Sequence, residues 1–231
     1  MRLTRLPLLL VLALALAACG GDGEDAAEAP APATAATTAT TPEAAPGGTG
    51  CQTVESPPPR DQPSLSAPTA ILDATKTYRL VVDTNCGAFT IELDLESAPQ
   101  TTASLVALAR AGFFDGTTFH RVVPGFVIQG GDPTGTGAGG PGYSTVDAPP
   151  SDATYTSGVV AMAKTGAEAP GTAGSQFFVV TGDDIGLPAD YAIVGRVVEG
   201  MENVLLIDAL GAGDGPPSQA VVIEEVTVEE S

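Results

Sequence analysis

The composition of the chain changes sharply near residue 70, and this change limits where a folded domain can lie. Residues 20–70 are mostly Ala, Thr, Pro, Gly, Ser and acidic side chains, with no aromatic residue. Such a stretch buries too little apolar surface to offset the entropy cost of ordering it. From Ile71 onward, short apolar runs alternate with turn residues. We therefore expect a disordered tether over residues 19–70 and a folded domain over residues 71–231.

The N-terminal residues 1–18 resemble an export signal. Arg2 and Arg5 precede an apolar run that is shorter than the roughly 20 residues a membrane-spanning helix needs. The run ends in the letters LAAC at residues 16–19, which resemble a bacterial lipobox. An ordinary cleavage site that precedes a cysteine by chance is the alternative. The lipobox interpretation predicts a signal peptide, a lipidated Cys19 and anchoring to the cell membrane on its extracytoplasmic face.

The other two cysteines form an even pair. If Cys19 is acylated, Cys51 and Cys86 remain in an oxidising compartment, where a disulfide between them is expected. A metal site is the alternative, but His120 is the only histidine and further ligands are lacking. We therefore expect a Cys51–Cys86 disulfide and no metal.

The charge of the chain narrows the classes of partner. The chain has nine Lys and Arg residues and 28 Asp and Glu residues, which gives a formal net charge of −19. Nucleic acid is excluded as a partner on this ground, because binding it requires a basic face. We expect a monomer that meets the membrane through its lipid anchor.

The folded part is predicted to be all-β in character. A hairpin is expected at residues 78–82 and 88–93, and a helix is expected to follow it and to end near Gly112. A second helix is expected at residues 202–210. The further predicted strands cover residues 118–123, 126–129, 158–163, 176–181, 192–197 and 221–228. Many short strands with only two helices indicate a barrel rather than alternating βαβ units.

Residues 119–132, with the sequence FHRVVPGFVIQGGD, are the most informative segment. They predict two strands that reverse at Pro124-Gly125. Arg121 is unusual there, because a cation in an apolar strand is costly unless it is paired or faces an open groove. The alternative is an arginine whose stem covers apolar surface while its head reaches water.

These residues resemble the cyclophilin family of peptidyl-prolyl cis/trans isomerases. The segment 119–132 matches the signature of that family almost letter for letter. Further matches are GFFDG at 112–116, AMA at 161–163, GSQFF at 174–178 and GRVVEGM at 195–201. Long motifs in the correct order are a specific signal. The resemblance covers residues 77–228 and implies a closed eight-stranded antiparallel barrel capped by two α-helices.

The resemblance also implies the chemistry and the residues of the site. Isomerising a prolyl bond breaks no covalent bond, so no nucleophile, metal or cofactor is expected. Arg121 is implied as the catalytic donor, and Gln129 as the residue that positions it and the substrate. The implied substrate-binding residues are Phe126, Val127, Ala163, Lys164, Gln176, Phe178, Leu187 and Tyr191. The implied substrates are proline-containing unfolded or exported polypeptides, whose folding the enzyme would assist at the membrane surface.

Three positions depart from the usual pattern of the family. Lys164 replaces an Asn, Tyr191 replaces a pocket His, and Gly186 lies nearest to a missing Trp. A non-catalytic module that binds proline peptides or acts as a holdase is therefore the alternative function, and an inert envelope lipoprotein is a third. Strand alternation directs His120 away from Arg121, so we expect His120 to be structural, and it directs Phe177 into the core.

Overall fold

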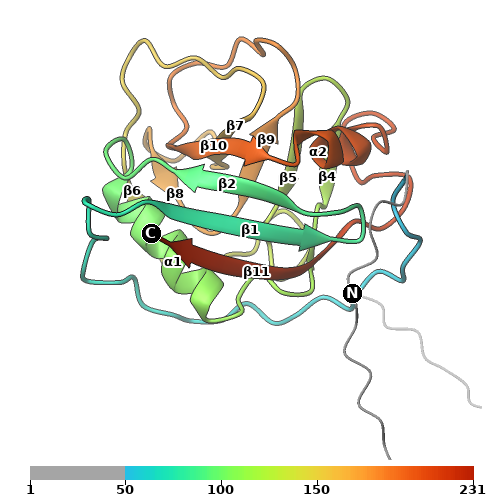
Figure 1. Ribbon diagram of the computed structural model, residues 1–231, viewed down its shortest axis with the longest axis horizontal. Helices are drawn as coiled ribbons and strands as arrows, with labels where there is room; N and C mark the ends of the chain where they lie inside the picture. Colours follow the sequence, from blue (N-terminus) through green and yellow to red (C-terminus); the bar gives the residue numbers. More distant parts are fainter. Residues whose placement is uncertain (1–49) are drawn as a thin grey trace, which may run out of the picture. The chain divides into compact units, whose positions relative to one another are not determined.

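A computed structural model describes residues 50–231 of the chain, and Figure 1 shows how their elements are arranged. The strands are β1 (Tyr78–Thr84), β2 (Phe89–Leu93), β3 (Thr117–Thr118), β4 (Arg121–Val123), β5 (Val127–Gly130), β6 (Thr145–Val146), β7 (Val159–Met162), β8 (Thr172–Ala173), β9 (Phe177–Val180), β10 (Ile193–Glu199) and β11 (Val222–Glu230). The helices of this part are α1 (Pro99–Arg110) and α2 (Met201–Asp208). The prediction of a β-dominated domain with two helices is confirmed for the described residues.

One large antiparallel sheet organises these strands. Its order is β3-β11-β1-β2-β10-β7-β9-β5-β4, and β6 and β8 form a separate pair. The predicted hairpin is confirmed, because β1 pairs with β2 around a turn in which Gly87 has a φ of 101°. The last strand, β11, pairs along the other edge of β1, from Tyr78 opposite Glu230 to Thr84 opposite Ile223.

The prediction of a closed eight-stranded barrel is wrong in strand number and in closure. The sheet has nine strands and curls strongly, but its edge strands β3 and β4 do not pair with each other. Only an isolated bridge between Thr118 and Asp132 lies between the two ends of the sheet. The edge strands are two and three residues long. In addition, the backbone N–H of Val122 in β4 donates to the carbonyl of Gly215 at 2.8 Å, so a loop occupies that edge.

Helix α1, which confirms the helix expected before Gly112, packs on the sheet through an apolar stripe. Leu105, Val106 and Leu108 are each at most 3% exposed. Ala98 is the N-cap, and no side chain caps the helix. Phe177 lies in the same core as this stripe, as its place in the strand predicts. Phe178 instead belongs to a second, smaller apolar cluster with Val127 and Tyr155.

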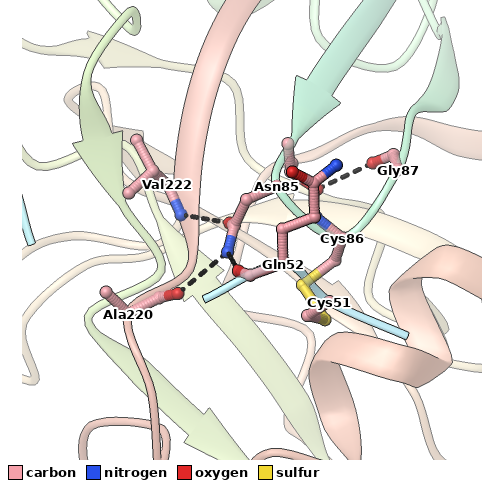
Figure 2. The surroundings of a disulfide bond; sticks show 8 residues. Cys51, Gln52, Asn85, Cys86, Gly87, Ala220 and Val222 are labelled. Atoms are coloured by element: carbon pink, nitrogen blue, oxygen red, sulfur yellow. Dashed lines mark hydrogen bonds between the residues drawn. A yellow bond between two sulfur atoms is a disulfide. The ribbon is translucent and has the colours of Figure 1, made fainter. Parts of the chain in front are cut away.

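The expected disulfide between Cys51 and Cys86 is present (Figure 2). Asn85, next to Cys86, ties three segments together. Its side-chain amide donates to the carbonyls of Gln52 at 2.6 Å and Ala220 at 3.1 Å, and its oxygen accepts from the N–H of Val222 at 2.9 Å. The turn between β1 and β2 is thereby fixed both to the segment that contains Gln52 and to the start of β11.

The expected tether falls partly inside the described residues. Residues 51–70 form no helix or strand, and in Figure 1 they run as a blue-to-cyan loop along the lower side of the domain. The backbone N–H groups of Arg60 and Leu65 donate to the carbonyls of Pro133 and Pro141, both at 2.9 Å. Contacts with the domain thus begin at Cys51 rather than near residue 71.

The expected signal peptide, residues 1–18, and the expected lipidation site, Cys19, lie outside the described residues. Within residues 50–231, neither helix has the length and hydropathy that crossing a membrane requires.

Replacing both Cys51 and Cys86 by serine is expected to lower the free energy of unfolding by about 3 to 4 kcal/mol. The bond joins residues 35 apart in sequence, and opening a loop of that size restores entropy to the unfolded chain. Urea denaturation checks this expectation. As a control, dithiothreitol should destabilise the wild type by a similar amount and leave the double variant unchanged. Equal urea midpoints and slopes for the wild type and the double variant would contradict the expected loss of stability.

Candidate functional site

The hairpin of β4 and β5 supplies the two central polar side chains of the site. Arg121 stands directly opposite Gln129 across this hairpin, and Gln129 stands opposite Phe178 on β9. Directly opposed residues of antiparallel strands point to the same face of a sheet. The hairpin reverses at the predicted Pro124-Gly125 turn, where Gly125 has a φ of 67°. Arg121, Gln129 and Phe178 therefore share one face.

A hollow of about 280 Å³ lies over this face. Its walls are Arg121, Phe126, Val127, Gln129, Ala163, Lys164, Phe178, Leu187 and Tyr191. These are nine of the ten catalytic and substrate-binding residues that the sequence predicts. The tenth, Gln176, lines a neighbouring hollow that shares Gln129, Ala163 and Lys164 with the first. The structure thus brings all ten together from β4, β5 and β9, from the turn between β4 and β5, and from the loops that follow β7, β8 and β9.

The floor of the hollow is apolar and firmly packed. Val127 and Phe178 are 2% and 4% exposed, and the rings of Phe178 and Tyr191 meet edge to face with centroids 5.6 Å apart. The hydroxyl of the buried Tyr155 donates to the carbonyl of Tyr191 at 2.8 Å and accepts from its N–H at 3.0 Å. The hollow, which takes its shape from these rings, is suited to a small apolar ring.

Arg121 is held at the rim of the hollow by an ion pair that the sequence analysis missed. Its Nε and Nη2 donate to the two carboxylate oxygens of Asp214 at 2.6 and 3.1 Å, and its Nη1 lies 3.4 Å from Oε1 of Gln129. A guanidinium carries five N–H groups. Two N–H groups, one on each Nη, therefore have no acceptor within the described residues.

The same pair sets the charge state of Asp214. Its carboxylate accepts the hydrogen bonds of Arg121 and feels the positive charge, and both effects lower its pKa below the ordinary aspartate value. Asp214 is therefore ionised over the whole physiological range of pH.

Gln129 and Gln176 extend this arrangement into a chain of hydrogen bonds. Nε2 of Gln129 donates to Oε1 of Gln176 at 3.0 Å, and Nε2 of Gln176 donates to the carbonyl of Gly139 at 2.9 Å. The two amides are thus oriented by one another, and Gln129 presents its oxygen to Arg121.

Lys164 lines the hollow, but its ammonium already has partners and is not available to a substrate. Its side chain is 3% exposed, and its ammonium pairs with Asp190 at 2.5 Å. The same ammonium donates to the carbonyls of Thr165 and Glu168, and it lies 5.5 Å from the ring centroid of Tyr191. Lys164 therefore joins the loop after β7 to the loop that carries Tyr191.

His120 does not line the hollow that holds Arg121. Both ring nitrogens are buried and have no hydrogen-bond partner within the described residues. Burial lowers the pKa of His120, so the ring is neutral at physiological pH. This placement agrees with the structural role predicted for it.

Asp214 and Asp190 carry no local sequence signal that could have identified them. Asp214 is 93 residues from Arg121, in a loop rich in Gly and Pro. Asp190 lies between β9 and β10, outside the motifs on which the prediction rested. Only the folded chain shows which acidic residues reach the site.

Comparisons with known proteins agree with this geometry. Residues 79–228 match the family described as "Cyclophilin type peptidyl-prolyl cis-trans isomerase/CLD". Peptidyl-prolyl cis-trans isomerase A of Mycobacterium tuberculosis is 37% identical over 172 residues, which cover 66% of this chain and 92% of that protein. Peptidyl-prolyl cis-trans isomerase B of Bacillus subtilis is 44% identical over 126 residues, 54% of this chain and 85% of that protein.

Solved structures give the same result for the fold. A cyclophilin-type isomerase of Cryptosporidium parvum superposes with a TM-score of 0.61 at 31% identity, covering 66% of this chain and 98% of that one. A second structure of that protein, determined in the presence of the dipeptide Ala-Pro, gives a TM-score of 0.60 at 30% identity. With the family match over residues 79–228 and the site built on the same segment, the chain belongs to the cyclophilin family and is a peptidyl-prolyl cis-trans isomerase.

Proposed function

We propose that Arg121 is the catalytic residue of this isomerase, and that the enzyme assists the folding of exported proteins at the membrane surface. The observation that carries the catalytic role is the guanidinium at the rim of an apolar hollow with two N–H groups left for a substrate.

The reaction has a barrier of about 18–20 kcal/mol, because rotation removes the partial double bond of the prolyl amide. The proline ring enters the hollow between Phe126, Phe178 and Leu187. As the amide twists, its nitrogen regains a lone pair, and an N–H of Arg121 donates to it. A donor that binds the twisted amide better than the planar one lowers the barrier.

Gln129 acts on both Arg121 and the substrate. Its oxygen lies 3.4 Å from Nη1 of Arg121, and its Nε2 is held by Gln176. It therefore restrains the guanidinium from the side opposite Asp214 and borders the path of the substrate carbonyl. The rate gain comes from orientation and charge, since no covalent bond is made or broken.

The location rests on the first residues and on the cysteines. The letters LAAC at residues 16–19 resemble a lipidation signal, and the Cys51–Cys86 disulfide is typical of oxidising compartments outside the cytoplasm. Substrates there are chains that have just been exported and whose Xaa-Pro bonds still exchange slowly.

Arg121→Ala is expected to lower kcat/KM for an Xaa-Pro peptide by about a hundredfold, in line with the loss of one preorganised donor. A coupled protease assay or NMR exchange spectroscopy measures the rate. Arg110→Ala is the matched control, because Arg110, at the end of α1, pairs with Glu230 of β11 and does not line the hollow. An unchanged rate in Arg121→Ala would remove the assigned role. Binding by the wild type without any rate enhancement would select the non-catalytic module.

Asp214→Asn is expected to lower kcat/KM about tenfold at neutral pH, because asparagine offers one neutral acceptor oxygen where the carboxylate accepts from both Nε and Nη2 of Arg121. The pKa of Asp214 is lowered, so the ion pair persists above the ordinary aspartate pKa and is lost as the pH falls through the lowered value. The wild-type rate should therefore show no Asp214-dependent loss at or above pH of about 4.

Asp183→Asn is the control for this prediction, because it removes one exposed carboxylate from the loop after β9 without touching Arg121. An NMR titration should show the pKa of Asp214 rising in Arg121→Ala while that of Asp73, which is lowered by Thr75, stays the same. A faster Asp214→Asn enzyme would show that Asp214 restrains Arg121 instead of orienting it.

Cys19→Ser is expected to release the protein from the membrane, because acyl chains attached to that sulfur supply the anchor. Expression in a bacterial host followed by Triton X-114 partitioning checks this: wild type enters the detergent phase and the variant stays in the aqueous phase. The Cys51→Ser/Cys86→Ser double variant should still enter the detergent phase. Detergent partitioning of Cys19→Ser would refute the anchor.

A further inference from the structure

A second hollow, of about 460 Å³, opens beside the one that holds Arg121. The two share Gln129, Ala163 and Lys164. A peptide in extended conformation advances about 3.3 Å per residue. With its proline in the first hollow, it therefore places a side chain one or two residues away in the second.

One wall of the second hollow comes from outside the family domain. Gln62 lines it, whereas the family match begins at residue 79. Gln62 belongs to the segment 51–65, which we call the strap. The strap runs along the domain from the disulfide to the loop that follows β5.

The strap is fixed on both sides of Gln62. Before it, the backbone N–H of Arg60 donates to the carbonyl of Pro133, and the guanidinium of Arg60 donates to the carbonyl of Phe113. After it, the N–H of Leu65 donates to the carbonyl of Pro141. Farther back, Cys51 is joined to Cys86, and Gln52 is bonded through its backbone to Asn85 (Figure 2). The position of Gln62 is therefore determined by its neighbours on the chain.

Close packing of the strap on the rim of the hollow supports the same conclusion. Gly142 has a φ of +88°, and a Cβ at that position would lie 2.8 Å from the carbonyl oxygen of Pro63 and 2.9 Å from Cα of Ser64. Only glycine allows this approach without a shift of the strap. The loop that lines the hollow and the strap are thus in direct backbone contact next to Gln62.

The polar groups around the second hollow differ in whether their hydrogen-bonding atoms already have a partner. The ammonium of Lys164 is taken by Asp190 and two carbonyls, and the amide of Gln176 is bonded to Gln129 and Gly139. The exposed side chain of Gln62 makes no hydrogen bond within the described residues. Glu168 uses one carboxylate oxygen, Oε2, to accept from Thr165.

Among the described side chains around the hollow, the amide of Gln62, one carboxylate oxygen of Glu168 and the hydroxyl of Ser144 are free, and no cation is free. A peptide side chain with an amide or a positive charge can bond to Gln62 and Glu168, whereas a carboxylate would meet Glu168 and an aliphatic chain would leave both groups unpaired.

We propose that Gln62 is a specificity-determining residue, and that with Glu168 it selects proline peptides that carry an amide or a positively charged side chain one or two residues from the proline. This rests on the proposed function, because it takes the first hollow to be the proline site. The strap, which lies outside the shared fold, supplies this selectivity.

The test uses four peptide series that differ in one residue, placed one or two positions before the proline or one or two positions after it. That residue is Gln, Lys, Leu or Glu. For wild type, Gln62→Ala and Gln62→Glu, both the exchange rate and the Kd by calorimetry are measured. In one of the series, wild type should prefer Gln and Lys to Leu and Glu. Gln62→Ala should reduce the preference for Gln over Leu by about fivefold, as expected for one hydrogen bond.

Gln62→Glu should increase the preference for Lys and weaken binding of the Glu peptide further, because it adds a second carboxylate to the hollow. Gln52→Ala is the matched control: it changes a glutamine of the same strap at the disulfide end, and it should leave all ratios unchanged. Equal effects of Gln62→Ala on every peptide, or no effect in any of the four series, would overturn the proposal.

Measuring Kd separates this proposal from the catalytic one. If wild type binds the peptides without accelerating exchange, and Gln62→Ala still changes the ratios, the catalytic role of Arg121 fails and the role of Gln62 stands. If exchange is accelerated but the ratios do not depend on residue 62, the proposed role of Gln62 fails and the catalytic role of Arg121 stands. Absence of any binding would overturn both.

Discussion

The site depends on the register of four neighbouring strands. Arg121 of β4 stands opposite Gln129 of β5, Gln129 opposite Phe178 of β9, and Phe178 opposite Ala161 of β7. This row crosses the sheet on one face, with the donor at one end and the apolar floor in the middle. A shift of any pairing by one residue would turn that strand's side chains to the other face. The buried side chains of β5, β7 and β9, nearly all fully enclosed, make such a shift costly.

The acidity of the chain explains how Arg121 is held. The chain has 28 acidic residues against nine basic ones, and within the described residues five of the seven Lys and Arg side chains pair with carboxylates. The two that do not, Arg60 and Arg196, donate to backbone carbonyls instead. Asp214 takes the Nε edge and therefore leaves an N–H on each Nη. The guanidinium is thus oriented by the pair and still has donors for a twisting amide.

The sequence was a good guide wherever the information was local. Strand alternation around Arg121 and at Phe177 and Phe178 could be predicted because successive side chains of a strand face opposite ways. Closure of the sheet could not, because it depends on whether two very short edge strands meet. Asp214 and Gln62 were also missed, since they come from loop and coil far away in sequence, where no periodicity fixes which side chain reaches the site.

The strap must be pinned because of its own composition. It contains Pro57, Pro58, Pro59 and Pro63, and its residue 62 borders the hollow next to the proposed proline site. A short segment free to move beside a binding site reaches an effective concentration of roughly millimolar there, so a loose strap would compete with other chains for the site. The disulfide at Cys51 and the backbone bonds of Arg60 and Leu65 remove that freedom. The same constraints therefore fix Gln62 at the edge of the second hollow, as the proposed selectivity requires.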